Sequence, residues 1–252
     1  MPFLAQLINH QDAQLKRQVA SCLANISKHT IDLAEIVVDN DIFPKILYRL
    51  KDSDHLVRKY AAICIREIAK HSIDLAKLIC NSGGAVAIVD FLLEAKGEGL
   101  PGIITLGYIS AFDETLAMGV ISAKGIPPLK ESLEDENESV RAAAAWSLGQ
   151  MGGHTPDHAK AMAENNIPRL LLDLYKDPRS SEDLKKKAKK ALKSILQMCS
   201  HLNALSPLIA DCPSEILHYI LHQFAKTLPN DPAAKKSFIQ SGGLKKIQEI
   251  KS

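Results

Sequence analysis

Apolar and small residues recur along the chain at helical spacing. The segment Asp54 to Lys70 predicts a helix with one apolar face, formed by Val57, Ala61, Cys64, Ile65 and Ile68. A shorter helix is predicted from Phe43 to Leu50, and another short helix after each Asp-Leu-Ala signature. The pattern therefore predicts an all-α protein built from units of three helices.

The same pattern returns at a nearly constant interval. The motif from His29 to Ala34 recurs at spacings of 42, 41 and 42 residues, in copies that begin at His71, Phe112 and His154. A weaker copy begins at His201, 47 residues further on, and the loop Lys176 to Asp183 accommodates the extra residues. Such a period is typical of armadillo and HEAT repeats, in which each unit packs on its neighbours.

A second motif, made of turn-forming residues, recurs with the same period, in copies at residues 39–44, 81–86, 122–127 and 164–168. Its Gly and Asn residues tolerate the left-handed position after a helix, and its Pro residues suit the first turn of the next helix. We expect one armadillo-repeat domain over residues 1–252, wound as a right-handed superhelical solenoid. Its predicted repeats are 1–28 (partial), 29–70, 71–111, 112–153 and 154–200, followed by irregular C-terminal helices over 201–252.

The two ends of the chain depart from the regular repeat. The start runs directly into an amphipathic stretch, so we expect a fragment of a longer array. Four apolar residues would then be exposed at an uncapped end, which predicts self-association there: Phe3, Leu4, Leu7 and Ile8. At the other end we predict helices at Ile216–Leu228 and Leu244–Ile250. Near the second helix the motif Ser241–Leu244 echoes Ser82–Ala85, and a polar edge is formed by Lys245, Lys246 and Lys251.

Composition argues against several partners. Hydrophobic residues make up 46% and charged residues 24%, which is ordinary for a globular protein. The formal net charge of +2 argues against nucleic acid. The five cysteines form no CxxC pair and indicate reduced thiols in an intracellular protein. Without a long apolar run or a signal peptide, no membrane association is expected.

The motifs for catalysis or metal binding are weak. His218 and His222 have a zinc-helix spacing, but no glutamate lies between them and no third ligand is marked. Three histidines occur one per repeat, too far apart for one metal, and are predicted to bond carbonyls at helix ends: His29, His71 and His154. No nucleophile elbow, Walker loop or dinucleotide-binding strand is present. We expect no enzyme activity, catalytic residue, metal, cofactor or small-molecule substrate.

Several segments resemble known families. Val140 to Gln150 resembles the third helix of armadillo repeats. Four further segments are similar to the axonemal central-apparatus armadillo-repeat proteins of the sperm-associated antigen family, in their C-terminal part: 65–71, 100–108, 149–156 and 241–246. The resemblance covers roughly residues 10 to 251. It implies a structural component of the central pair in the cytoskeleton of the cilium or flagellum, required for motility. The implied partners are other central-apparatus proteins and microtubules.

The long third helices carry the candidate contact residues, because in armadillo arrays these helices line a concave surface. In nuclear-import adaptors of this fold, Trp and Asn four residues apart form ladders that hold a basic peptide. Only Asn25 and Trp146 match that ladder here, and they lie in different repeats, so an import-signal site is doubtful. We predict that the ladder positions contact another protein: Asn25, Glu67, Tyr108, Trp146 and Gln150. Trp146 is equally consistent with a core residue.

A lysine-rich stretch supplies a second candidate surface, at Lys185, Lys186 and Lys189. The simpler interpretation is a solvated helix face. The functional interpretation is a surface for an anionic partner, such as an acidic tubulin tail. The sequence as a whole favours a scaffold of the axonemal central apparatus. The alternative is a soluble peptide-binding adaptor of the nuclear-import or catenin type.

Overall fold

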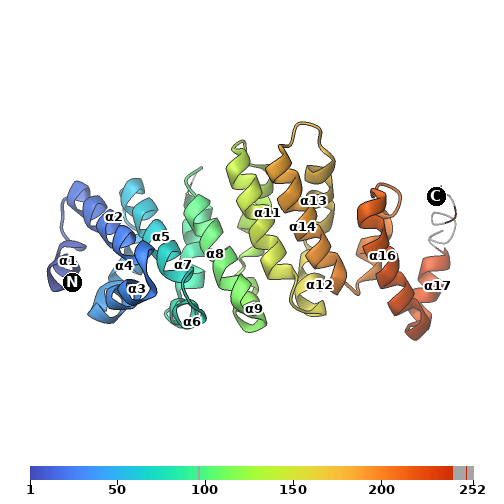
Figure 1. The fold of residues 1–252 in the computed structure, drawn as a ribbon, viewed down its shortest axis with the longest axis horizontal. Helices are drawn as coiled ribbons and strands as arrows, with labels where there is room; N and C mark the ends of the chain where they lie inside the picture. Colours follow the sequence, from blue (N-terminus) through green and yellow to red (C-terminus); the bar gives the residue numbers. More distant parts are fainter. Residues whose placement is uncertain (96, 241–247, 249–252) are drawn as a thin grey trace. The chain divides into compact units, whose positions relative to one another are not determined.

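The computed structural model describes residues 1–95, 97–240 and 248, which form helices joined by short turns (Figure 1). No strand occurs in these ranges, so the all-α prediction is confirmed. The chain divides into two compact parts, which we name the N-terminal unit, Met1–Ser147, and the C-terminal unit, Leu148–Ser252. The division falls within one long helix, α11 (Glu138–Gly152).

In the N-terminal unit, α2, α5 and α8 lie side by side and correspond to the predicted third helices (Figure 1). The predicted helices Phe43–Leu50 and Asp54–Lys70 are found as α4 and α5, within one residue at each end. The elements before α11 are α1 (Pro2–Leu7), α2 (Ala13–His29), α3 (Ile31–Val37), a π-helical turn (Val38–Ile42), α4 (Phe43–Arg49), α5 (His55–Ala69), α6 (Ile73–Asn81), α7 (Gly84–Glu94), α8 (Leu100–Phe112), α9 (Glu114–Ser122), α10 (Ile126–Glu131) and a 3-10 turn (Ser132–Glu134).

In the C-terminal unit, α14 packs against α13 and α16. After α11 the elements are α12 (Pro156–Glu164), α13 (Ile167–Lys176), α14 (Glu182–Met198), α15 (Leu202–Leu205), a 3-10 turn (Ser206–Leu208), α16 (Ser214–Thr227), a 3-10 turn (Leu228–Asn230) and α17 (Pro232–Gln240). The predicted helix Ile216–Leu228 is found as α16. Part of the predicted tail lies outside the described residues, namely the helix Leu244–Ile250, the motif Ser241–Leu244, and Lys245, Lys246 and Lys251.

Three first helices, α3, α6 and α9, begin at a capping residue in the same place of the repeat. The side chains of Thr30, Ser72 and Asp113 accept a hydrogen bond from the backbone amide three residues on, at 3.3, 3.2 and 2.7 Å. The fourth position is Thr155, whose Oγ1 pairs instead with Nδ1 of His158 at 2.7 Å. Since such a cap contributes about 1 kcal/mol, the recurring motif fixes where each repeat starts.

A left-handed residue marks the turn between the first and second helices of every regular repeat. The φ angles are 53° at Asp41, 75° at Gly83, 62° at Lys124 and 61° at Asn166. Gly and Asn fit this position as predicted, but Lys124 is found there although Gly125 follows it. Gly125 has φ −68° and is close-packed instead, because an added Cβ would lie 2.7 Å from Cγ1 of Val120.

Buried ion pairs join α2 to the region before α5. Lys16 Nζ lies 2.5 Å from Oδ2 of Asp52, and Arg49 Nη1 lies 2.9 Å from the same oxygen. Arg17 pairs with Asp54, which also caps α5 by accepting from the amide of Val57 at 2.9 Å. Burial alone would raise the pKa of Asp52, but its bonds to Lys16 and Arg49 hold that pKa below the usual range. These contacts fix the register of neighbouring repeats.

The N-terminal end is only partly as predicted. Phe3 is 70% exposed, and Leu4 and Leu7 are half-buried, but Ile8 is completely buried. The expectation of an exposed Ile8 is wrong because α1 packs back onto α2 and the π-helical turn. Lys45 secures this arrangement by donating from Nζ to the carbonyl of Ala5 at 3.1 Å. The remaining exposed apolar surface of α1 therefore centres on Phe3.

Candidate protein-binding surfaces

The third helices of the N-terminal unit bring two candidate residues into contact. The rings of Tyr108 and Trp146 meet edge to face, with centroids 5.3 Å apart and planes at 74°. Both side chains are half-buried, so Trp146 packs on the unit and also presents part of its ring. Gly107 allows this approach, because an added Cβ would lie 2.3 Å from Cζ3 of Trp146. The pair forms a small aromatic patch on α8 and α11.

The other candidates on these helices are less available to a partner. Asn25 is exposed, and its Nδ2 donates to the carbonyl of Ser21 at 3.0 Å. Glu67 is buried and bonded by Arg66 Nε at 3.0 Å and by Lys70. Burial opposes ionisation of Glu67, but these bonds keep its pKa below the ordinary value. A basic peptide would have to compete with two cations of the same helix for this carboxylate.

The end of α2, the first of the third helices, is capped from the next repeat. His71 Nε2 lies 2.6 Å from the carbonyl of Ser27, and Lys70 Nζ donates to the carbonyl of Lys28 at 3.2 Å. Both acceptors lie in the last turn of α2, where helix carbonyls lack intrahelical partners. His71 thus bonds a helix-end carbonyl as the sequence predicts, but the carbonyl belongs to the preceding repeat.

The C-terminal unit contains the lysine surface. Lys185, Lys186 and Lys189 line one groove of about 650 Å³ between α13, α14 and the start of α16. The other residues of this lysine groove are Tyr175, Lys176, Glu182 and Pro213. The sequence run thus folds so that its three candidate lysines face one hollow. Gln150, the remaining candidate of this unit, is half-buried on α11.

Sequence reasoning missed the non-lysine walls of the lysine groove. Tyr175 lies in the last turn of the second helix of its repeat, while Pro213 belongs to the irregular region where the period of the sequence weakens. Glu215 forms an ion pair with Lys189, and Lys189 Nζ lies 5.6 Å from the ring centroid of Tyr175. Among these residues, Tyr175 is the one that the sequence could have indicated, because its aromatic side chain precedes the lysine-rich helix.

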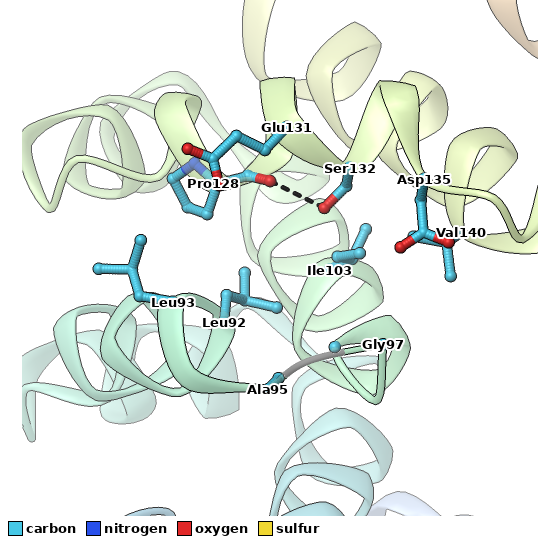
Figure 2. A pocket seen from close by; sticks show the side chains of 11 residues that line it. Leu92, Leu93, Ala95, Gly97, Ile103, Pro128, Glu131, Ser132, Asp135 and Val140 are labelled. Carbon is cyan, nitrogen blue, oxygen red and sulfur yellow. Dashed lines mark hydrogen bonds between the residues drawn. The ribbon is translucent and has the colours of Figure 1, made fainter.

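A smaller cavity of about 250 Å³ lies in the N-terminal unit between α7 and α10 (Figure 2). Leu92 and Leu93 point toward the segment that carries Pro128 and Ser132, and Asp135 lies at one edge (Figure 2). Ser132 Oγ donates to the carbonyl of Pro128 at 2.8 Å, so its hydroxyl is engaged by its own helix. The cavity thus presents leucine side chains and the carboxylates of Glu131 and Asp135, without an activated nucleophile.

Within the described ranges, no group of three or more His, Cys, Asp or Glu side chains is placed to hold a metal ion. In the same ranges, no single helix is long and apolar enough to cross a membrane. The bent pair α6 and α7, with 76° between its helices, reaches that length and composition only when both are counted together.

Comparison with known proteins finds similarity over parts of the chain. The HEAT repeat family matches residues 42–72 and 126–154. Sperm-associated antigen 6 of Mus musculus is 53% identical over 127 residues, and that of Homo sapiens 52%, which is 50% of this chain in each case. Over this half, the chain is similar to the sperm-associated antigen family of armadillo-repeat proteins. It spans 25% of the length of these two relatives.

Solved structures establish the fold of the chain. A designed armadillo repeat protein superposes with a TM-score of 0.76 at 19% identity, covering 90% of this chain and 99% of that chain. Another, in complex with the peptide (KR)4, gives 0.74 at 19% identity, covering 90% and 98%. The predicted armadillo-repeat solenoid is thereby confirmed. Fold and family together support a protein-interaction scaffold built from repeats.

Proposed function

We propose that this chain is a scaffold segment of the axonemal central apparatus in cilia or flagella, and that it is required for motility. The observation that carries the proposal is the 53% identity to mouse sperm-associated antigen 6 over half of the chain. A sperm cell moves by its flagellum, and stacked repeats offer the long surface that a structural tether needs. The partners we propose are other central-apparatus proteins and microtubules.

Within this proposal, the five predicted repeats act as one array, and the aromatic patch of Tyr108 and Trp146 is the principal contact. A half-buried aromatic pair suits a binding surface, since tryptophan and tyrosine are enriched among residues that dominate interface energetics. The two rings also pack on each other in the space left by Gly107, and this contact limits the entropy lost on binding. We propose no catalytic step, because the hydroxyl and carboxylate groups described above serve helix caps and ion pairs.

Crosslinking mass spectrometry on isolated axonemes tests the proposal. We expect crosslinks from lysines of this chain to other central-apparatus proteins, and co-sedimentation of the recombinant chain with central-pair preparations. Trp146→Ala should weaken co-sedimentation, while Val86→Ala, which alters an exposed apolar residue on α7, should not. Absence of the chain from central-pair crosslinks, with a clear signal from known axonemal proteins, would contradict the assignment.

The adaptor alternative has one observation in its favour, the designed armadillo protein solved with the basic peptide (KR)4. In this chain Glu67 is already bonded to Arg66 and Lys70, which disfavours a basic ligand at that position. A peptide array separates the two functions. Sequence-specific micromolar capture of short peptides that is lost in Trp146→Ala would favour the adaptor.

A further inference from the structure

The lysine groove differs from the other charged surfaces of the chain in its balance of charge. Lys185, Lys186, Lys187, Lys189, Lys190 and Lys193 lie on α14. Three of these six lysines have a carboxylate partner, at Glu182, Asp183 and Glu215. Lys186 is exposed and has no ion pair among the described residues, and the same holds for Lys190. The helix therefore carries uncompensated positive charge beside a groove.

The carboxylates that touch the groove are weakly held. Lys185 Nζ lies 3.5 Å from Glu182, whose side chain is 95% exposed. The pair of Lys189 with Glu215 joins side chains that are 41% and 56% exposed. Exposed pairs of this kind contribute little, because water competes for both charges. Carboxylates from another molecule could replace Glu182 and Glu215 with little loss of free energy. These two pairs therefore indicate that the groove lysines accept carboxylate ligands.

The walls of the groove add a second element of recognition. Tyr175 and Pro213 supply apolar surface next to the ammonium groups, and the ring of Tyr175 lies beside Lys189. The volume of about 650 Å³ falls in the range of sites that hold a compact ligand or a short segment. Apolar walls with spaced cations suit a chain of carboxylate side chains on a peptide backbone. A nucleic acid suits the chain less, because its formal net charge is only +2.

We propose that the lysine groove binds an extended acidic segment of a protein partner. Glutamate or aspartate side chains of that segment pair with Lys186 and compete with Glu182 and Glu215 for Lys185 and Lys189. The backbone of the segment lies against Tyr175 and Pro213. The proposal rests on the scaffold function proposed above and names the class of partner that this part of the scaffold takes.

Fluorescence anisotropy of the full chain with labelled octaglutamate tests the proposal, at about 0.15 M salt, where the Debye length is about 8 Å. We expect saturable binding that Lys186→Glu weakens about tenfold, because it removes one attraction and adds a repulsion. Lys190→Glu makes the same charge change on the same helix but outside the groove, and we expect a smaller loss of about threefold, because it lies within a Debye length of Lys186. Glu215→Gln should tighten binding about threefold, since it frees Lys189.

Three results would overturn the assignment. They are no binding of octaglutamate, equal losses in Lys186→Glu and Lys190→Glu, or equally tight binding of a labelled single-stranded oligonucleotide with the same sensitivity to Lys186→Glu. Circular dichroism confirms that each variant is folded. If octaglutamate fails while the chain still crosslinks to central-apparatus proteins, the groove assignment falls and the scaffold function stands. If octaglutamate binds but the axonemal crosslinks are missing, the groove assignment stands and the axonemal function falls.

Discussion

Two sets of charged contacts between repeats, one in each unit, differ sharply in burial. In the N-terminal unit, Lys16 and Arg49 meet Asp52 with side chains only 10%, 11% and 4% exposed. In the C-terminal unit, Arg169 meets Asp211 at 2.6 Å with side chains 36% and 46% exposed. Both contacts link one repeat to the next. Because an unpaired charge is costly only where water is excluded, the first set fixes register and the second remains available for exchange.

Removing the shared carboxylate of the buried set should give the largest effect. Asp52→Ala leaves Lys16 and Arg49 buried without their acceptor, and we expect a loss of roughly 3 kcal/mol in the free energy of unfolding. Urea denaturation followed by fluorescence of Trp146, the single tryptophan, reports this for the N-terminal unit. The matched change Asp211→Ala should cost under about 1 kcal/mol by circular dichroism. Equal losses would remove the contrast between the units.

Close packing of the third helices gives the next effect. In Gly149→Ala the new Cβ would lie 2.7 Å from Cα of Ala191. That backbone atom can move only if the helix that carries it moves. In Gly107→Ala the obstacles are the ring of Trp146 and Oγ of Ser147, both side-chain groups that can shift. We expect roughly 3 kcal/mol for the first change and roughly 1 kcal/mol for the second, measured by thermal denaturation. Only Gly107→Ala should shift the emission maximum of Trp146, and an unchanged spectrum would show that the ring does not move.

Acid should weaken the N-terminal unit through Asp54. The hydrogen bond from Arg17 lowers the pKa of Asp54 to about 2, from 3.8 in the unfolded chain. A pKa that is lower in the folded state means that this stabilisation is complete above about pH 5 and is lost as the pH falls toward 2. In Asp54→Asn, which keeps a capping side chain, the urea midpoint should fall less steeply over this range. A slope identical to that of the parent chain would contradict the assignment.

The exposed pair of the C-terminal unit should give the smallest change in stability. Glu215→Gln removes the partner of Lys189, and we expect less than about 0.5 kcal/mol in the free energy of unfolding. The same variant should bind octaglutamate more tightly, so stability and affinity respond separately. A large loss of stability would mean that Glu215 holds the fold, as Asp52 does in the other unit.

The sequence predicted the repeat because its signals are local. Capping residues such as Ser72 act within one helical turn, and the residue at the left-handed position acts on a single turn. Local signals were less specific where a glycine stands beside the residue that adopts the left-handed conformation. Lys124 is left-handed next to Gly125, and this choice depends on the contact of Gly125 with Val120.

The sequence predicted on which helices the candidate contact residues lie, but not which side chains they contact. The repeat register placed Tyr108 and Trp146 on third helices, yet their edge-to-face contact joins two repeats and depends on the space left by Gly107. Glu67 has a ladder position like the others, but two neighbouring cations on its own helix engage it. Burial of Ile8 likewise follows from the way α1 folds back, which its own sequence does not specify.

By itself, the sequence determined the helical class, the period of the repeat, the caps and the positions that face the third-helix surface. These follow from interactions within a few residues, which the order of side chains specifies directly. Tertiary structure decided which charges are buried at Asp52 and which remain exchangeable at Lys189, and it assembled the lysine groove from α13, α14 and the start of α16. Burial and groove shape depend on packing between segments distant in sequence. Small differences in solvent access there determine how strongly an ion pair stabilises the fold.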